Sequence, residues 1–431
     1  MPANEPNEGH LRITVDELAY GLFVADLDRP WSEVPVMFQG FEVRDDEELE
    51  ILRRHCEYVY VDRVRSRQDA LDALKAETDQ TSPGSSEAPT PVERRDVADA
   101  FSEARQPDKD AFRELVSEAH ENRAAALDLM DGVMSSLASG EILDTESARA
   151  AVSDLAGTVS RNTTASLWLT NLRERDEYLT RHAVNACVLM LAYGVHQGFA
   201  RPELERMAMG TLLMDVGMAK LPDAILAKTG SLSADEMRLM MQHPSDGVEI
   251  VKAAGYVPRE TVDIIQMHHE RLDGSGYPRG LQGTQIPLHA RLAGMLDTYD
   301  AMTSPRVFQD ATPADRVLQY LLNESETTFG SILVQQLIRC IGLYPVGSLI
   351  ELDNGAVGIV IGTRPDARVR PTVLLVRTPD GDFYDKRILL NLAADPDATG
   401  PSARTVRRVL DPVYEDIDVP GIVAFEFGVS E

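Results

Sequence analysis

The amino-acid sequence predicts a multi-domain α+β protein in which a mainly helical region lies between a small α/β domain and a β-rich domain. Its length of 431 residues suffices for about two to four domains. A stretch rich in charge, Ser and Pro interrupts the chain between residues 66 and 110. Beyond it, apolar residues first recur at helical spacing and then, after residue 343, alternate with polar ones. These observations divide the chain into four segments.

Residues 9–65 are expected to form the small α/β domain. Apolar and β-branched residues mix in its first part, and a short helical pattern then runs into the strand-like sequence Tyr58-Val59-Tyr60-Val61. Residues 66–110 contain too little apolar surface to pack into a core, so a flexible linker is expected there.

Residues 111–343 are expected to be helical, because Val116, Ala119, Leu127 and Met130 continue a helical spacing that recurs along this region. Residues 344–431 are expected to form a β-rich domain. The turn sequences Asp353-Asn354-Gly355 and Pro379-Asp380-Gly381 separate its alternating runs, as in an antiparallel sheet.

The composition excludes several classes of protein. Asp and Glu number 70 against 42 Lys and Arg, so the net charge of −28 repels DNA and RNA polymers. A phosphodiester substrate would need local cations, and bound metal ions could supply them. Three distant cysteines build neither a disulfide framework nor a zinc knuckle. The acidic N-terminus does not resemble a signal peptide, and no apolar run reaches the ~20 residues of a membrane span. A cytoplasmic protein without membrane contact is therefore expected.

Histidines and carboxylates gather in the helical region. His243, His268 and His269 fall within 27 residues, and His182 lies upstream. The accompanying carboxylates are Asp215, Glu270, Asp273, Asp297 and Asp300. Imidazole and carboxylate together suit Fe, Mn, Zn or Ni. A lone histidine on a helix is more often structural, but an adjacent pair before a Gly-rich loop favours a metal site.

The segment HHERLDGSGYPRGLQGTQIP, residues 268–287, resembles the signature of HD-GYP domains, the cyclic di-GMP phosphodiesterase branch of the HD metallohydrolases. Blocks around His182, His243 and Asp297 follow in the family's order, and the resemblance covers residues 176–312. The sequence before residue 65 is similar to a domain of unknown function that often precedes HD-GYP modules.

This resemblance implies an HD-type helical bundle that binds at most two divalent metals, with iron or manganese favoured. One metal would be held by His182, Asp215 and Asp297, and the other by Asp215, His243, His268 and His269, so that Asp215 bridges them. The substrate would contact Asp273, Gly274, Gly276, Tyr277, Pro278 and Arg306. No residue is assigned as a general acid. The implied reaction is hydrolysis of cyclic di-GMP to pGpG or GMP in bacterial signal transduction.

Two positions depart from the family pattern. Where His-Asp-x-Gly-Lys is expected, the chain has Met214-Asp215-Val216-Gly217-Met218. A thioether is a poor ligand for iron or manganese sites of this kind, so the first metal would keep three ligands of four. Met214 could also simply pack in the core. Tyr178 occupies the position of the Glu that serves a third metal, and Lys220, two residues after Met218, is not expected to compensate.

Three interpretations follow. The first is a phosphodiesterase with reduced activity. The alternative is a degenerate module that binds cyclic di-GMP or a partner protein without turnover. A purely structural module is the third, and the intact Gly-Tyr-Pro loop and second metal site count against it. A protein partner and a homodimer are both compatible with this architecture.

Overall fold

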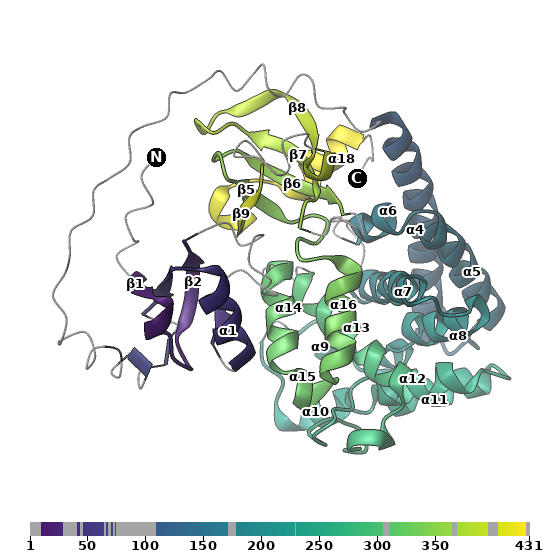
Figure 1. The fold of residues 1–431 in the computed structure, drawn as a ribbon. Coiled ribbons are helices and arrows are strands. Elements are labelled where there is room, and N and C mark those ends of the chain that lie inside the picture. Colours follow the sequence, from purple (N-terminus) through teal and green to yellow (C-terminus); the bar gives the residue numbers. More distant parts are fainter. Residues whose placement is uncertain are drawn as a thin grey trace, which may run out of the picture. The chain divides into compact units, whose positions relative to one another are not determined.

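The structure is a computed structural model that describes residues 10–28, 41–43, 46–63, 66–67, 70–71, 74, 109–170, 178–228, 230–304, 311–363, 369–394 and 404–427. Most of these residues lie in helices, and the strands form two small sheets (Figure 1). The predicted mixture of a mainly helical chain with smaller β-containing parts is thereby confirmed in outline. Nearly all of the predicted linker, residues 66–110, lies outside the described residues.

The described residues divide into two compact units. The first comprises those before Asp108 together with Leu349–Ile359 and the described part of Arg364–Leu410. The second comprises those of Asp108–Ser348, together with Val360–Thr363 and those after Leu410. None of the described helices has the length and apolar character needed to cross a membrane.

The N-terminal sheet has the order β1-β4-β2-β3, with antiparallel pairing throughout. Its elements are β1 (His10–Thr14), β2 (Phe23–Leu27), β3 (Phe41–Glu42), α1 (Asp46–His55) and β4 (Tyr58–Asp62), with a 3-10 turn at Val15–Glu17. In β4 the alternation of side chains buries Val59 and Val61 completely while the tyrosines stay partly exposed. Leu49 and Leu52 of α1 join the same apolar core.

The helical unit begins with α4 (Lys109–Ala138), α5 (Thr145–Arg161), α6 (Thr163–Leu169), α7 (Tyr178–Gln197) and α8 (Arg201–Leu212). It continues with α9 (Asp223–Leu226), α10 (Ala234–Met240), α11 (His243–Ala253), α12 (Arg259–Met267) and α13 (Leu288–Thr303). The helices α14 (Ala314–Asn323), α15 (Ser325–Thr328) and α16 (Ser331–Ile341) follow, and 3-10 turns lie at Val216–Lys220 and Gly283–Gln285.

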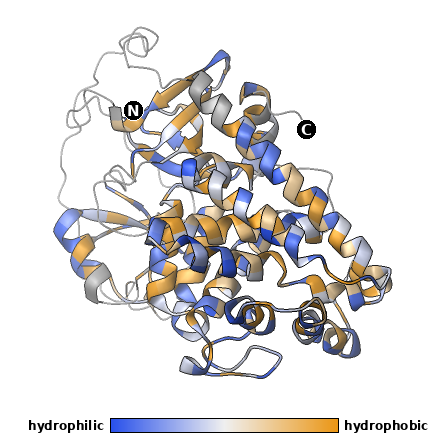
Figure 2. Cartoon of the chain, turned by 90° about the vertical axis from the view of Figure 1, so that its right-hand side faces the viewer, coloured by the Kyte–Doolittle hydropathy of each residue, from blue (hydrophilic) through white to orange (hydrophobic). Residues whose placement is uncertain are grey.

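Helix α7 is the central element of this unit. All its residues from Thr180 to Gly194 are buried, and it packs against α5, α8 and α13. A helix that is apolar nearly all round can be stable only where neighbours cover every side. Figure 2 shows orange and blue alternating along many of the helices, as expected for amphipathic helices around a common core. The side chains of α7, His182 among them, are therefore enclosed by neighbouring helices.

The C-terminal sheet has the order β8-β7-β6-β5-β9. Its strands are β5 (Leu349–Leu352), β6 (Val357–Gly362), β7 (Thr372–Arg377), β8 (Phe383–Asn391) and β9 (Val406–Leu410), with a 3-10 turn at Leu392–Ala394. Gly355 and Gly381 have φ of +88° and +98° in the two turn sequences singled out above, where glycine adopts the left-handed region without strain. Two short helices follow, α17 (Pro412–Glu415) and α18 (Val419–Phe427).

Candidate metal centre

Four side chains from three places in the chain converge in the helical unit. Asp215 follows α8, His243 is the first residue of α11, and His268 and His269 follow α12 directly. One ligand atom from each lies within 4.8 Å of the others. Two adjacent histidines point about 100° apart within a helix, but α12 ends at Met267. The end of the helix therefore lets both imidazoles reach one point.

His243 and His268 each bind a backbone carbonyl through Nδ1, so that their Nε2 atoms face Asp215. Nδ1 of His243 lies 2.8 Å from the Met240 carbonyl, and Nδ1 of His268 lies 3.1 Å from that of Ile264. A carbonyl only accepts, so both Nδ1 atoms carry the proton, and in the neutral ring Nε2 has a free lone pair. The two Nε2 atoms lie 3.3 Å apart.

These two Nε2 atoms also lie 3.3 and 3.7 Å from Oδ1 of Asp215. Two lone pairs that meet beside a carboxylate repel one another unless a cation lies between them. A metal-bound histidine usually donates its other ring N–H to a backbone carbonyl or a carboxylate, which fixes the orientation of the ring, and both imidazoles have this arrangement. The donor set therefore fits a divalent metal.

The protonation states of Asp215 and His269 suit metal binding. Burial would raise the pKa of Asp215, but the adjacent imidazoles of His243 and His268 outweigh burial and hold that pKa well below its usual value. Burial, and then the neighbouring His268, lower the pKa of His269 well below its usual value. Asp215 is thus ionised and His269 neutral near pH 7, which are the forms that bind metals.

His182 lies between three carboxylates next to this cluster. Its Nε2 is 2.8 Å from Oδ1 of Asp297 and 3.8 Å from Oδ2 of Asp215, and its Nδ1 is 2.7 Å from Oδ2 of Asp300. Burial alone would lower the pKa of His182, but hydrogen bonds to Asp297 and Asp300 outweigh it and raise that pKa well above its usual value. His182 must therefore lose its Nε2 proton before it can bind a metal. It would then form, with Asp215 and Asp297, a second group of donor atoms that shares Asp215 with the first.

The two departures from the expected pattern have different surroundings. Met214 is fully buried, and the adjacent Asp215 is also buried. Met218 is partly buried. The ammonium of Lys220 lies 2.8 Å from Glu249 and 3.4 Å from Asp246. Lys220 is therefore engaged by carboxylates at the surface.

The Gly-Tyr-Pro loop folds over His269. The Tyr277 ring stacks on the His269 imidazole, with centroids 4.5 Å apart and planes at 26°. Gly276 packs so closely on the backbone that an added Cβ would lie 2.4 Å from the His269 carbonyl oxygen, so only glycine fits there. Asp273 accepts a hydrogen bond from the Ser275 amide at 2.9 Å. Arg306, the expected phosphate contact, lies outside the described residues.

Three residues support the cluster in ways that the sequence did not specify: Asp300 and Glu270 were noted only as accompanying carboxylates, and Asn185 was not noted. Asp300 binds Nδ1 of His182, and Asn185 donates to its other oxygen at 3.0 Å. Glu270 is 1% exposed and accepts from the backbone amides of Arg279 and Leu281, both at 2.8 Å. The spacing held a signal for the first two: Asn185 follows His182, and Asp300 follows Asp297, by three residues, which places each pair on one helix face. Glu270 stood out as a carboxylate beside the histidine pair, but nothing in the sequence indicated its bonds to the loop amides, because those partners are backbone groups.

Two family models match the chain. Residues 168–333 match the model described as HD domain, and residues 10–148 match that described as a domain of unknown function, DUF3391. The chain therefore contains a region similar to HD domains, preceded by a region similar to DUF3391. The Gly-Tyr-Pro loop lies within the first region, as the resemblance to HD-GYP proteins implies. The resemblance seen in the sequence is thereby confirmed.

Three relatives illustrate the family. The cyclic di-GMP phosphodiesterase PA4108 of Pseudomonas aeruginosa is 29% identical over 368 residues, which are 84% of this chain and 84% of that protein. The cyclic di-GMP phosphodiesterase response regulator RpfG of Xanthomonas campestris is 37% identical over 33% of this chain and 38% of its own. The 3'3'-cGAMP-specific phosphodiesterase 2 of Vibrio cholerae is 32% identical over 39% of this chain and 31% of its own.

Proposed function

We propose that this protein is a metal-dependent cyclic di-GMP phosphodiesterase of HD-GYP type. The observation that carries the proposal is the convergence of Asp215, His243, His268 and His269 within 4.8 Å. The relative from Pseudomonas aeruginosa, which the chain matches over 84% of both lengths, is named for this activity. In this proposal the catalytic domain is the helical region of residues 111–343. The accessory domains are residues 9–65 and 344–431, and the linker of residues 66–110 joins the N-terminal accessory domain to the catalytic domain.

The charges at the site explain why the reaction needs metals. Asp215, Asp297 and Asp300 would repel a cyclic dinucleotide, whose two phosphodiester groups are each negative. Divalent metals at this place would reverse that repulsion, generate the nucleophile from water and stabilise the charge that develops on the phosphoryl oxygens. Iron or manganese suits the mixed imidazole and carboxylate donors. We propose two metal positions that share Asp215.

The remaining residues position the substrate and the ligands. Asp300 fixes the ring of His182 through Nδ1, which directs Nε2 at Asp297 and Asp215. Glu270 ties the loop at Arg279 and Leu281, so that Tyr277 stays over His269. The Tyr277 face and the glycine backbone of this loop offer a surface against which a nucleotide can lie close. Arg306 is the proposed phosphate contact by position in the family motif.

We further propose that turnover is slower than in relatives with an intact His-Asp pair. Met214 offers the first metal position a neutral thioether, and Lys220 is occupied by Glu249 and Asp246. The alternative is a module that binds cyclic di-GMP, or a partner protein, without turnover, because the loop around Tyr277 does not depend on Met214. A cytoplasmic location and a homodimer remain predictions.

The test combines metal content and turnover on one preparation. The full chain, loaded with Mn²⁺ or Fe²⁺, is assayed with cyclic di-GMP and, because of the Vibrio relative, with 3'3'-cGAMP. Asp215→Asn is the inactivating variant. His289→Ala is its matched control, since His289 pairs with Asp263 at 3.3 Å away from the cluster.

Formation of pGpG or GMP by the parent and His289→Ala, but not by Asp215→Asn, supports the proposal. Cyclic di-GMP that binds and stays intact on the metal-loaded chain supports the alternative. Faster cleavage of 3'3'-cGAMP than of cyclic di-GMP would overturn the proposed substrate.

A further inference from the structure

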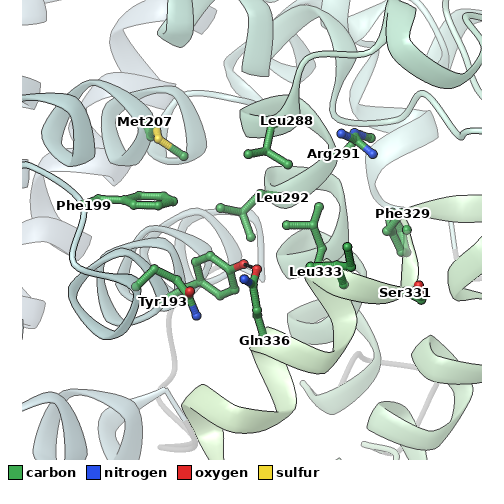
Figure 3. Close-up of a pocket in the computed structure, with 13 residues that line it drawn as sticks. Tyr193, Phe199, Met207, Leu288, Arg291, Leu292, Phe329, Ser331, Leu333 and Gln336 are labelled. Carbon is green, nitrogen blue, oxygen red and sulfur yellow. Dashed lines mark hydrogen bonds between the residues drawn. The ribbon is translucent and has the colours of Figure 1, made fainter.

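A cavity of about 400 Å³ lies in the helical unit between α7, α8, α13 and α16 (Figure 3). Its volume falls in the range of small-molecule sites. The walls are mostly apolar or aromatic, and they include Tyr193, Phe199, Met207, Leu292, Phe329 and Leu333. Tyr193 and Phe199 meet edge to face, with ring centroids 6.3 Å apart. Such walls favour an apolar ligand body.

The cavity is separate from the candidate metal centre. Arg291, on its wall, precedes Asp297 by six residues of α13, about 9 Å along the helix axis. Tyr193 follows His182 by eleven residues of α7, about 16 Å. The cavity therefore lies toward the opposite ends of the two helices that carry His182 and Asp297, and none of the residues of the metal centre lines it.

The polar groups that line the cavity differ in whether they have hydrogen-bond partners. The Tyr193 hydroxyl donates to Oε1 of Gln336 at 2.6 Å, which the dashed line in Figure 3 marks. Arg291 differs: its Nε is buried without a hydrogen-bond partner, and no ion pair among the described residues includes its guanidinium. Among the described lining residues Arg291 alone is charged. A guanidinium that lines an apolar cavity and pairs with no described carboxylate favours an anionic ligand.

We propose that the cavity binds an amphipathic carboxylate, a small molecule with an apolar body and one carboxylate group. The body would lie against Phe199, Leu292 and Phe329, and the carboxylate would accept from the planar fork of Arg291. The single guanidinium among apolar lining residues can neutralise one negative charge on a ligand. A compact, doubly charged phosphate would leave most of the apolar wall uncovered.

The experiment is calorimetric titration of the full chain with decanoate, with 1-decanol as the neutral probe of the same length. Arg291→Gln removes the positive charge. Arg291→Lys keeps the charge but loses the planar guanidinium that can donate two parallel hydrogen bonds to a carboxylate. Arg149→Gln is the matched control, because Arg149 is an exposed arginine of α5 that pairs with Glu146 away from the cavity.

We expect decanoate to bind the parent and Arg149→Gln equally, and its Kd to rise about 10- to 100-fold in Arg291→Gln. Arg291→Lys should fall between them. Metal loading should be unchanged in all three variants, so the result is independent of the proposed phosphodiesterase activity. Absence of decanoate binding to the parent would overturn the proposal. Equal affinity for decanol, or an unchanged Kd in Arg291→Gln, would do the same.

Discussion

Glu270 allows a quantitative test of how the Gly-Tyr-Pro loop is held. Its two carboxylate oxygens accept separately from the amides of Arg279 and Leu281, each at 2.8 Å, and Leu281 is 9% exposed. Glu270→Gln keeps the shape but replaces one acceptor oxygen by an NH₂ group. One backbone N–H then loses its acceptor and faces another donor.

The expected cost follows from those two bonds. A buried donor left without a partner costs about 1–3 kcal/mol. Since 1.4 kcal/mol is a factor of ten, local opening of the loop becomes about 5- to 150-fold more frequent. Amide hydrogen exchange reports such local opening directly. We therefore expect the amides of residues 279 and 281 to exchange faster by that factor, while those of α7 keep their protection.

The control for this measurement lies in the same loop. Asp273 is exposed and accepts from Ser275, and Asp273→Asn retains an acceptor oxygen, so its exchange should match that of the parent. Unchanged protection of Leu281 in Glu270→Gln would refute the reasoning. So would equal acceleration in Asp273→Asn.

Three further predictions concern the metal centre and the charges. His268→Ala removes one of the two facing Nε2 atoms, so elemental analysis should find about one metal ion per chain fewer, while His289→Ala loses none. The double variant Met214→His, Met218→Lys should gain metal and turn over cyclic di-GMP at least about tenfold faster; unchanged metal content and rate would contradict a weakened first position. Burial raises the pKa of Asp315, and its Oδ1 has no hydrogen-bond partner. Because the pKa of Asp315 is higher in the folded than in the unfolded protein, ionisation of this carboxyl lowers the free energy of unfolding as the pH rises. Asp315→Asn should therefore melt at a higher temperature than the parent at pH 7, and the difference should vanish below about pH 3.8; a lower melting temperature at pH 7 would contradict this.

Much of the candidate metal centre could be predicted because its residues are chemically unusual. Histidines beside a Gly-rich loop stand out in a sequence, and the end of α12 at Met267 follows the Gly signals after His269. The alternation in Tyr58–Asp62 and the turn glycines Gly355 and Gly381 likewise predicted strands and turns where the structure has them.

The supporting contacts could not be predicted in the same way. Glu270 binds backbone amides nine and eleven residues away, and such bonds depend on the loop path rather than on residue type. The cavity beside Arg291 arises from helices far apart in sequence, and an arginine without a partner looks like any surface arginine until its surroundings are known. The pairing of strands also depends on contacts between distant segments, so the order β8-β7-β6-β5-β9 did not follow from the alternation.

The two oxygens of Asp215 face different partners: Oδ1 lies 3.3 Å from His243, and Oδ2 lies 3.8 Å from His182. A cation that draws electron density from one oxygen leaves less at the other, and two cations held by one carboxylate also repel each other. In the proposed two-metal arrangement the two positions would therefore not fill independently. A metal titration of this chain should then show negative cooperativity, and Met214 in place of an imidazole should change the affinity for both ions.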